Sequence, residues 1–94
     1  MNNIFGIFTK DRSKAESLMS DITHKIGSSK VEKKYSKNEL RVFFKDGTEL
    51  IWFNPSGDGC GRRLRGAWVD KEVTDEYFNS VITPMLMTDM VIRF

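Results

Sequence analysis

Residues 57–66, with the sequence GDGCGRRLRG, hold the residue types best suited to chemistry: four glycines, three arginines and the only cysteine of the chain. The backbone N–H groups of closely spaced glycines can surround an anion, and guanidinium groups bind phosphate oxygens. A P-loop would also need Gly-Lys-Ser or Gly-Lys-Thr at the start of a helix, and neither tripeptide occurs in the chain. Two interpretations stay open: an anion-binding loop, or a surface connection without a ligand.

A reactive thiol is the second candidate, because Cys60 lies beside arginines. Nucleophilic catalysis also needs a base, and the only histidine, His24, falls opposite the apolar stripe of the helix expected around it. One Cys and one His are also too few for a typical zinc site. The sequence therefore predicts a protein that is not an enzyme, with no catalytic residue, no metal and no cofactor.

Four acidic residues follow one another near the end of an expected strand: Asp70, Glu72, Asp75 and Glu76. Carboxylates at the carboxyl end of a strand can hold Mg²⁺. Alternatively, Asp75 and Glu76 oppose the dipole of a following helix, while the other two are solvated loop charges. The pattern by itself does not separate these two roles.

Basic side chains gather between positions 25 and 45, where seven Lys and Arg residues oppose two glutamates, although the net charge of the whole chain is only +2. Tyr35, Phe43 and Phe44 interrupt this segment, and nucleic-acid bases stack on aromatic side chains within basic surfaces. Phe44 alternates with Val42, which predicts that it lies in the core. The alternative is a solvated lysine face without a partner.

The two basic segments together give a hypothesis for anion or nucleic-acid binding. The residues predicted for this site are Arg62, Arg63, Arg65, Lys33 and Lys34. Clustered Lys and Arg side chains on one surface are the usual electrostatic signature of a nucleic-acid binder.

The spacing of hydrophobic residues predicts the helices and strands that must position these side chains. It predicts strands at 4–8, 31–35, 40–45, 48–53, 64–69 and 90–94, and helices at 13–26 and from 74 onward. The order is β-α-β-β-β-β-α-β, which indicates an α+β or α/β fold with a mixed sheet and two helices in a single small domain, 1–94.

Local signals mark the ends of these elements. Ser13 and Glu16 fit a capping box at the start of the first helix. Asp-Gly at 46–47 predicts a two-residue type I′ hairpin turn. Thr74 is the expected N-cap of the second helix, and Pro84 predicts a kink or a new segment late in it.

Composition sets the class of protein. The chain has 94 residues, of which 39% are hydrophobic and 12% aromatic, enough for a core without disulfide bonds. A single cysteine is typical of a reducing compartment, and no run approaches the roughly 18 apolar residues of a membrane span. We expect a cytoplasmic protein without a membrane role.

From 41 to 86 the chain resembles small uncharacterised proteins of phages and prophages, through VFFKDGTELIWFNPS and GRRLRGAWVDKEVTDEYFNSVITPML. It also resembles part of the large terminase ATPases: a strand, a Gly-Thr turn, a second strand, Arg-Gly, and a hydrophobic strand ending in Asp. The resemblance places Asp70 at the Walker B acid of those motors. Lys71 stands where a Glu normally follows, and no Walker A motif exists, so related strand arrangement is implied and ATP hydrolysis is not.

These observations lead to two functional hypotheses. The first is a non-enzymatic binding protein of phage type that engages nucleic acid or another anionic partner through the Gly/Arg-rich stretch. The alternative is a protein-interaction factor or homo-oligomer that uses exposed apolar side chains, with Met85, Met87 and Tyr77 as candidates.

Overall fold

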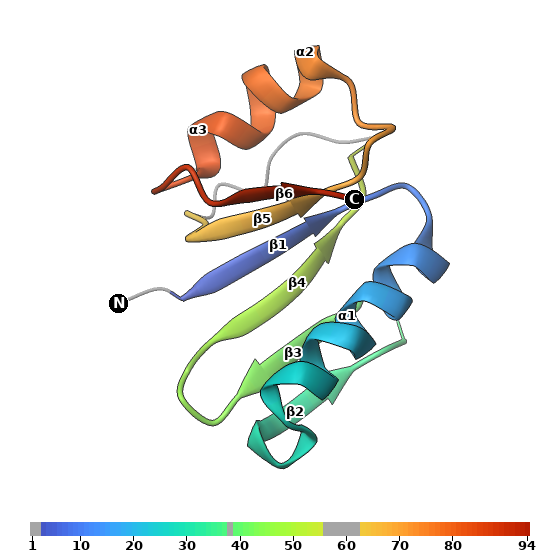
Figure 1. The fold of residues 1–94 in the computed structure, drawn as a ribbon, viewed down its shortest axis with the longest axis vertical. Helices are drawn as coiled ribbons and strands as arrows, with labels where there is room; N and C mark the ends of the chain where they lie inside the picture. Colours follow the sequence, from blue (N-terminus) through green and yellow to red (C-terminus); the bar gives the residue numbers. More distant parts are fainter. Residues whose placement is uncertain (1–2, 38, 56–62) are drawn as a thin grey trace.

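β1 (Ile4–Phe8) lies in the middle of a six-stranded mixed sheet in a computed structural model of the protein (Figure 1). The structure describes residues 3–37, 39–55 and 63–94. The strand order is β2-β3-β4-β1-β5-β6. The other strands are β2 (Val31–Tyr35), β3 (Arg41–Phe44), β4 (Glu49–Phe53), β5 (Gly66–Val69) and β6 (Val91–Arg93).

The helices complete the predicted order. α1 (Arg12–Ile26) follows β1, and a helical segment at 75–85 precedes β6. That segment consists of α2 (Asp75–Tyr77), a π-helical turn (Phe78–Ile82) and α3 (Thr83–Met85). The expected α+β class, with a mixed sheet and two helical segments in the order β-α-β-β-β-β-α-β, is confirmed. No helix in the described part of the chain is both long and apolar enough to span a bilayer.

Parallel pairing dominates the centre of the sheet. β1 pairs in parallel with β4 and with β5, and β5 pairs in parallel with β6. β2, β3 and β4 form an antiparallel meander on the other side. The central position of β1 explains its unbroken apolar sequence, because successive residues such as Ile7 and Phe8 point to opposite faces and both are buried.

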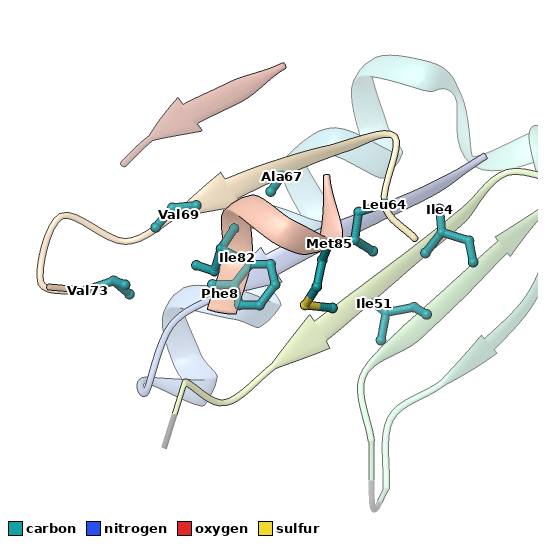
Figure 2. Packing of buried hydrophobic residues seen from close by; sticks show 9 residues of the cluster. All are labelled: Ile4, Phe8, Ile51, Leu64, Ala67, Val69, Val73, Ile82 and Met85. Atoms are coloured by element: carbon teal, nitrogen blue, oxygen red, sulfur yellow. The ribbon is translucent and has the colours of Figure 1, made fainter. Parts of the chain in front are cut away.

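The two helical layers cover opposite faces of the sheet. α1 buries Ala15 and Met19 against the face that carries Val42 and Leu50. The segment at 75–85 packs on the other face, as Figure 2 shows. The buried residues of this second core cluster are Ile4, Phe8, Ile51, Leu64, Ala67, Val69, Val73, Ile82 and Met85.

Each helical layer covers only part of the sheet face on which it packs. The two uncovered parts lie at opposite ends of the sheet. On the face of α1, the side chain of Ile92 in β6 remains 56% exposed. On the face of the 75–85 segment, Tyr35 in β2 remains 45% exposed. We call the open part near β2 and β3 the β2–β3 surface and the open part near β5 and β6 the β5–β6 surface.

The start of α1 differs from the expected capping box. Asp11 is the N-cap, and its carboxylate accepts hydrogen bonds from the backbone N–H groups of Ser13 and Lys14 at 2.9 and 3.4 Å. Ser13 therefore lies inside the helix. Glu16 pairs with Arg12 at 3.0 Å instead of reaching back to a cap. The prediction was wrong because an Asp two residues upstream offers the stronger, charged acceptor.

The hairpin between β3 and β4 is confirmed, but its turn is not the predicted type I′. Only Gly47 has a positive φ, 92°, whereas type I′ would need one at Asp46 as well. The N–H of Gly47 donates to the carbonyl of Phe44 at 3.0 Å, and the carboxylate of Asp46 accepts from the N–H of Thr48 at 2.9 Å. This is a three-residue loop closed by a glycine in the left-handed region.

The second helical segment begins and breaks where the sequence predicts. The hydroxyl of Thr74 accepts from the N–H of Tyr77 at 3.1 Å, as an N-cap should. The helix then widens to a π turn, in which the N–H of Thr83 donates to the carbonyl of Phe78. α3 starts at Thr83, because Pro84 has no N–H and its ring would clash with a carbonyl in the preceding turn.

Candidate nucleic-acid interface

The carboxyl ends of β1 and β5 lie side by side at the centre of the sheet. The chain leaves β1 through α1 on one face of the sheet and leaves β5 through the 75–85 segment on the other. In open sheets with helices on both faces, ligands bind where neighbouring strands connect in opposite directions. Thr9 follows β1 and Asp70 follows β5 at this point.

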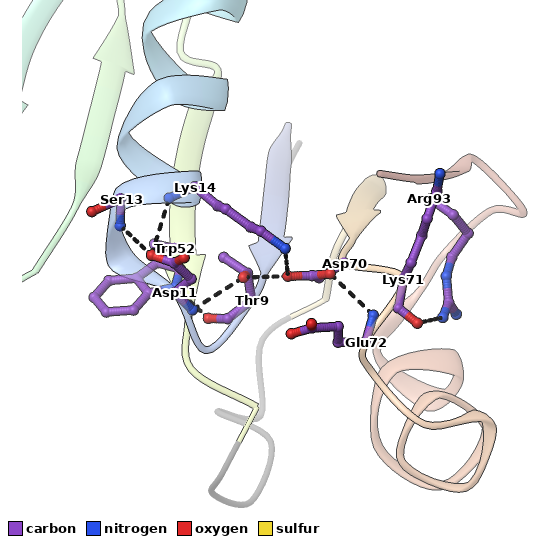
Figure 3. A network of polar contacts seen from close by, with 9 residues as sticks. All are labelled: Thr9, Asp11, Ser13, Lys14, Trp52, Asp70, Lys71, Glu72 and Arg93. Atoms are coloured by element: carbon purple, nitrogen blue, oxygen red, sulfur yellow. Dashed lines mark hydrogen bonds and ion pairs between the residues drawn. The ribbon is translucent and has the colours of Figure 1, made fainter.

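Thr9 and Asp70 are joined by a buried hydrogen bond, in which the Thr9 hydroxyl donates to Oδ2 of Asp70 at 2.7 Å (Figure 3). Lys14 Nζ lies 3.3 Å from the same oxygen, and the N–H of Glu72 donates to Oδ1 at 3.0 Å. Burial raises the pKa of Asp70, but these hydrogen bonds and the charge of Lys14 lower it by more, so its pKa lies below the ordinary value. Asp70 is thus a carboxylate whose two oxygens are already occupied.

The space beside Asp70 is small. A cavity of about 120 Å³ opens there, between Lys10, Glu72 and Tyr77. Ligand pockets usually measure roughly 300–1,000 Å³. The contacts of Asp70 therefore indicate a structural role, in which its carboxylate connects the ends of β1 and β5. The space beside it is smaller than a usual substrate site.

The acidic residues near Asp70 do not converge on one point. Glu72, Asp75 and Glu76 are exposed, and the last two occupy the first turn of the helical segment. No group of three metal-ligating side chains that could hold an ion occurs within the described ranges. Asp75 and Glu76 lie at the start of a helix, as one interpretation of the sequence expected, but Asp70 is 2% exposed and is not the solvated loop charge that the same interpretation expected.

The remaining candidates for chemistry are exposed or outside the described residues. His24 is exposed on α1, as predicted. Cys60 and the glycines at 57, 59 and 61 lie outside the described residues, as does Arg62. The predictions of an anion-binding loop and of a reactive thiol therefore stay predictions, because the glycines and the cysteine on which they depend lie outside the described residues.

The described members of the predicted binding site fall into two groups. Lys33 and Lys34 lie on the edge strand β2. Arg63 and Arg65 are exposed at the amino end of β5, where Nη1 of Arg65 donates to the side-chain oxygen of Asn3 at 3.2 Å. Four strand spacings separate β2 from β5, about 19 Å in all. The structure does not bring the lysines and these arginines together.

Aromatic side chains lie beside Lys33 on the β2–β3 surface, while Lys34 is directed to the face of α1. Tyr35 is opposite Arg41, and Lys33 is opposite Phe43, so these four side chains share one face of the antiparallel pair. The rings of Tyr35 and Phe43 meet edge to face, with centroids 5.9 Å apart and planes at 79°. The opposite face of β3 carries Phe44, which is 4% exposed and belongs to the core, as expected.

Arg41 holds this arrangement in place and contributes little net charge to it. Its guanidinium lies 4.8 Å from the ring centre of Phe43 and pairs with Glu49 at 3.1 Å and with Glu39 at 3.6 Å. Two carboxylates neutralise the single cation, so Arg41 positions Phe43. The further positive charges at this end of the sheet are those of lysines.

A broad hollow of about 640 Å³ lies next to Tyr35. Lys34, Tyr35, Ser36, Lys37 and Glu39 line it. The segment 30–37 holds four lysines and one glutamate, a net charge of 4 − 1 = +3. An exposed aromatic ring therefore stands next to a hollow with two lysines on its wall.

The binding site predicted from the sequence did not include Tyr35 and Phe43, although both lie in the basic segment at 25–45. The signal was the alternation in two neighbouring segments: Lys33 and Tyr35 in one strand, Arg41 and Phe43 in the next. Their common face follows only from the pairing register of β2 and β3, which a single sequence does not specify.

Comparison of the chain with models of protein families, with curated proteins and with solved structures finds no match. Any conclusion on function therefore depends on the site itself.

Proposed function

We propose that the protein is a non-enzymatic module that binds single-stranded nucleic acid on the β2–β3 surface. The observation that supports this proposal is the pair of ring side chains, Tyr35 and Phe43, on the part of the sheet face that the 75–85 segment leaves open. Sheet-based modules bind single strands by stacking bases on aromatic side chains of neighbouring strands, while cations follow the phosphates. Lys33 shares the sheet face of these rings, and Lys37 lines the hollow next to Tyr35, whereas Lys34 lies opposite Val42 and is directed to the face of α1.

The remaining parts of the proposal follow from the sequence. The single cysteine supports a cytoplasmic place of action. The resemblance to phage and prophage proteins supports a phage-type origin. The absence of a Gly-Lys-Ser/Thr motif supports a role in binding without nucleotide hydrolysis.

Fluorescence anisotropy with a labelled single strand tests the proposal. An oligonucleotide of about 10 nucleotides lies within the site sizes of such modules. Tyr35→Ala should weaken binding by about 1–3 kcal/mol, roughly 5- to 150-fold, because it removes one stacking platform. Tyr35→Phe is the matched control: it keeps the ring and should retain most of the affinity.

Charge reversal tests the lysines separately from the rings. Lys33→Glu should weaken binding, whereas Lys71→Glu makes the same charge change beyond β5, at the other end of the sheet, and should have little effect. Affinity should fall with salt by about 0.7 log units per phosphate contact for each tenfold rise, about 1.4 log units for the two contacts of Lys33 and Lys37.

Two results would contradict the proposal. One is the absence of binding at low salt, where the electrostatic contribution is largest. The other is a larger loss from reversing Arg63 and Arg65 than from reversing Lys33. That result would move the site to the amino end of β5, where the sequence hypothesis included the arginines.

A further inference from the structure

The two edges of the sheet differ in how they are protected against pairing with another chain. β2 is a charged edge: it carries Lys33 and Lys34, and a register shift between Val31 and Lys33 disrupts its ladder. Lysines and bulges are standard means of keeping an edge strand from adding to another sheet. The edge at β2 is therefore protected.

β6 lacks these features at the opposite edge. Its sequence is Val-Ile-Arg, and only its length of three residues limits pairing. The guanidinium of Arg93 is directed back to its own chain, where it donates to the carbonyls of Lys71 and Val73 at 3.4 and 2.9 Å. It therefore does not place a charge at the edge.

The hydrogen-bonding groups of the β6 backbone alternate between the side of β5 and the outer edge of the sheet. The carbonyl of Met90 accepts from Ala67 at 2.9 Å, and the N–H of Phe94 donates to Val69 at 3.0 Å, so both of these residues face β5. Peptide groups alternate in direction along a strand, so the N–H and C=O groups of Val91 and Arg93 point away from the sheet. These are four groups that another strand could use.

The side chains next to this edge form an apolar surface on the face of α1. Met90 and Ile92 are 53% and 56% exposed, and Phe94 is half-buried against the same cluster as Trp68. A hollow of about 350 Å³ runs from Met90 and Ile92 to Phe5, over the position where Gly66 has no side chain. This β5–β6 surface is continuous with the unpaired edge.

From this arrangement we infer that β6 pairs antiparallel with β6 of a second copy of the chain, about a two-fold axis at Ile92. The strand is self-complementary in that register. Val91 lies opposite Arg93 of the second copy, and the four outward N–H and C=O groups form two reciprocal hydrogen-bonded pairs. Ile92 meets Ile92 of the second copy directly on the axis.

The same register also matches the apolar side chains. Residues 90, 92 and 94 share the face of α1, so Met90 lies opposite Phe94 of the second copy, and Phe94 lies opposite Met90. Contacts between a thioether and an aromatic ring are favourable. Six apolar side chains would form one row across the axis, and an isologous contact of this kind closes as a dimer.

Light scattering coupled to size exclusion tests the association. The wild-type protein should have twice the mass of the 10.9 kDa chain at high concentration. Ile92→Lys should give a monomer with an unchanged circular dichroism spectrum, since Ile92 is exposed and its loss leaves the core intact. Ile26→Lys is the matched control, because Ile26 is 41% exposed at the end of α1 and lies outside the proposed contact.

Disulfide trapping tests the register, in a Cys60→Ser background. Residues opposite each other in a non-hydrogen-bonded pair have Cα atoms about 4.5 Å apart, within disulfide range, so Ile92→Cys should cross-link rapidly. Val91→Cys places its Cα atoms about 8 Å apart and should not. A monomeric wild type, a dimer that survives Ile92→Lys, or equal cross-linking at both positions would each overturn the inference.

Discussion

The hydroxyl of Thr9 and the carboxylate of Asp70, 61 positions apart in the chain, form a 2.7 Å hydrogen bond in the interior. The bond ties the carboxyl end of the central strand to that of its neighbour. Both residues are almost fully buried, Thr9 at 0% and Asp70 at 2% exposure. Buried hydrogen bonds to a charged group are among the stronger single contributions to stability, so this contact lends itself to a direct test.

Thr9→Val replaces the hydroxyl with a methyl group of similar shape. It should lower the free energy of unfolding by about 1.5–3 kcal/mol, because the buried carboxylate loses one donor and the N–H of Asp11 loses the hydroxyl that accepts from it at 3.1 Å. Chemical denaturation measures the change. Thr83→Val makes the same substitution at an exposed position and should cost much less. Equal losses at the two positions would show that the Thr9–Asp70 bond adds nothing to stability.

The pH dependence of stability should report the same carboxylate. The folded-state pKa of Asp70 lies below its ordinary value, so its charged contacts stabilise the fold above about pH 4. As the pH falls through the folded pKa, the carboxylate is protonated and this contribution is lost. The difference in unfolding free energy between wild type and Asp70→Asn should therefore be largest near neutral pH and shrink in acid. A constant difference from neutral pH to about pH 2 would contradict the shifted pKa.

The N-cap of α1 provides a test that separates the observed cap from the one predicted by the sequence. Asp11→Ala should destabilise the protein by about 1 kcal/mol, a fall in melting temperature of about 4–8 °C. Ser13→Ala should be nearly neutral, since Ser13 contributes its backbone N–H and not its hydroxyl to the cap. A larger effect at Ser13 than at Asp11 would restore the capping-box interpretation.

The hairpin loop depends on one glycine. Gly47 has a φ of 92°, and an added Cβ would meet no atom within 4 Å, so any penalty comes from the backbone and not from a clash. Gly47→Ala should cost about 1–2 kcal/mol, and Gly47→Asn should cost less, because Asn tolerates the left-handed region better. Thermal unfolding of the two variants measures this order. The reverse order would mean that the loop relaxes to another turn.

The sequence was sufficient for the elements and their order. The apolar run at 4–8, the helical stripe within 13–26 and the Asp-Gly pair at 46–47 are local patterns, and each depends on residues a few positions apart. The structure confirms all three, with local corrections at the cap of α1 and in the turn. Of the three residues expected to expose apolar surface to a partner, Met85 is 6% exposed and belongs to the core, Tyr77 is partly buried against the same cluster, and Met87 is 43% exposed as expected.

Only the tertiary structure decided which of these elements are neighbours. Pairing of β1 with β4 and β5 joins segments more than 40 residues apart, and it brings Thr9 to Asp70 while it keeps Lys33 away from Arg65. The register of β2 with β3 places Tyr35 and Phe43 on one open face. Strand order and register depend on the packing of whole sheet faces, which local propensity does not encode, so the two open surfaces could be seen only in the folded chain.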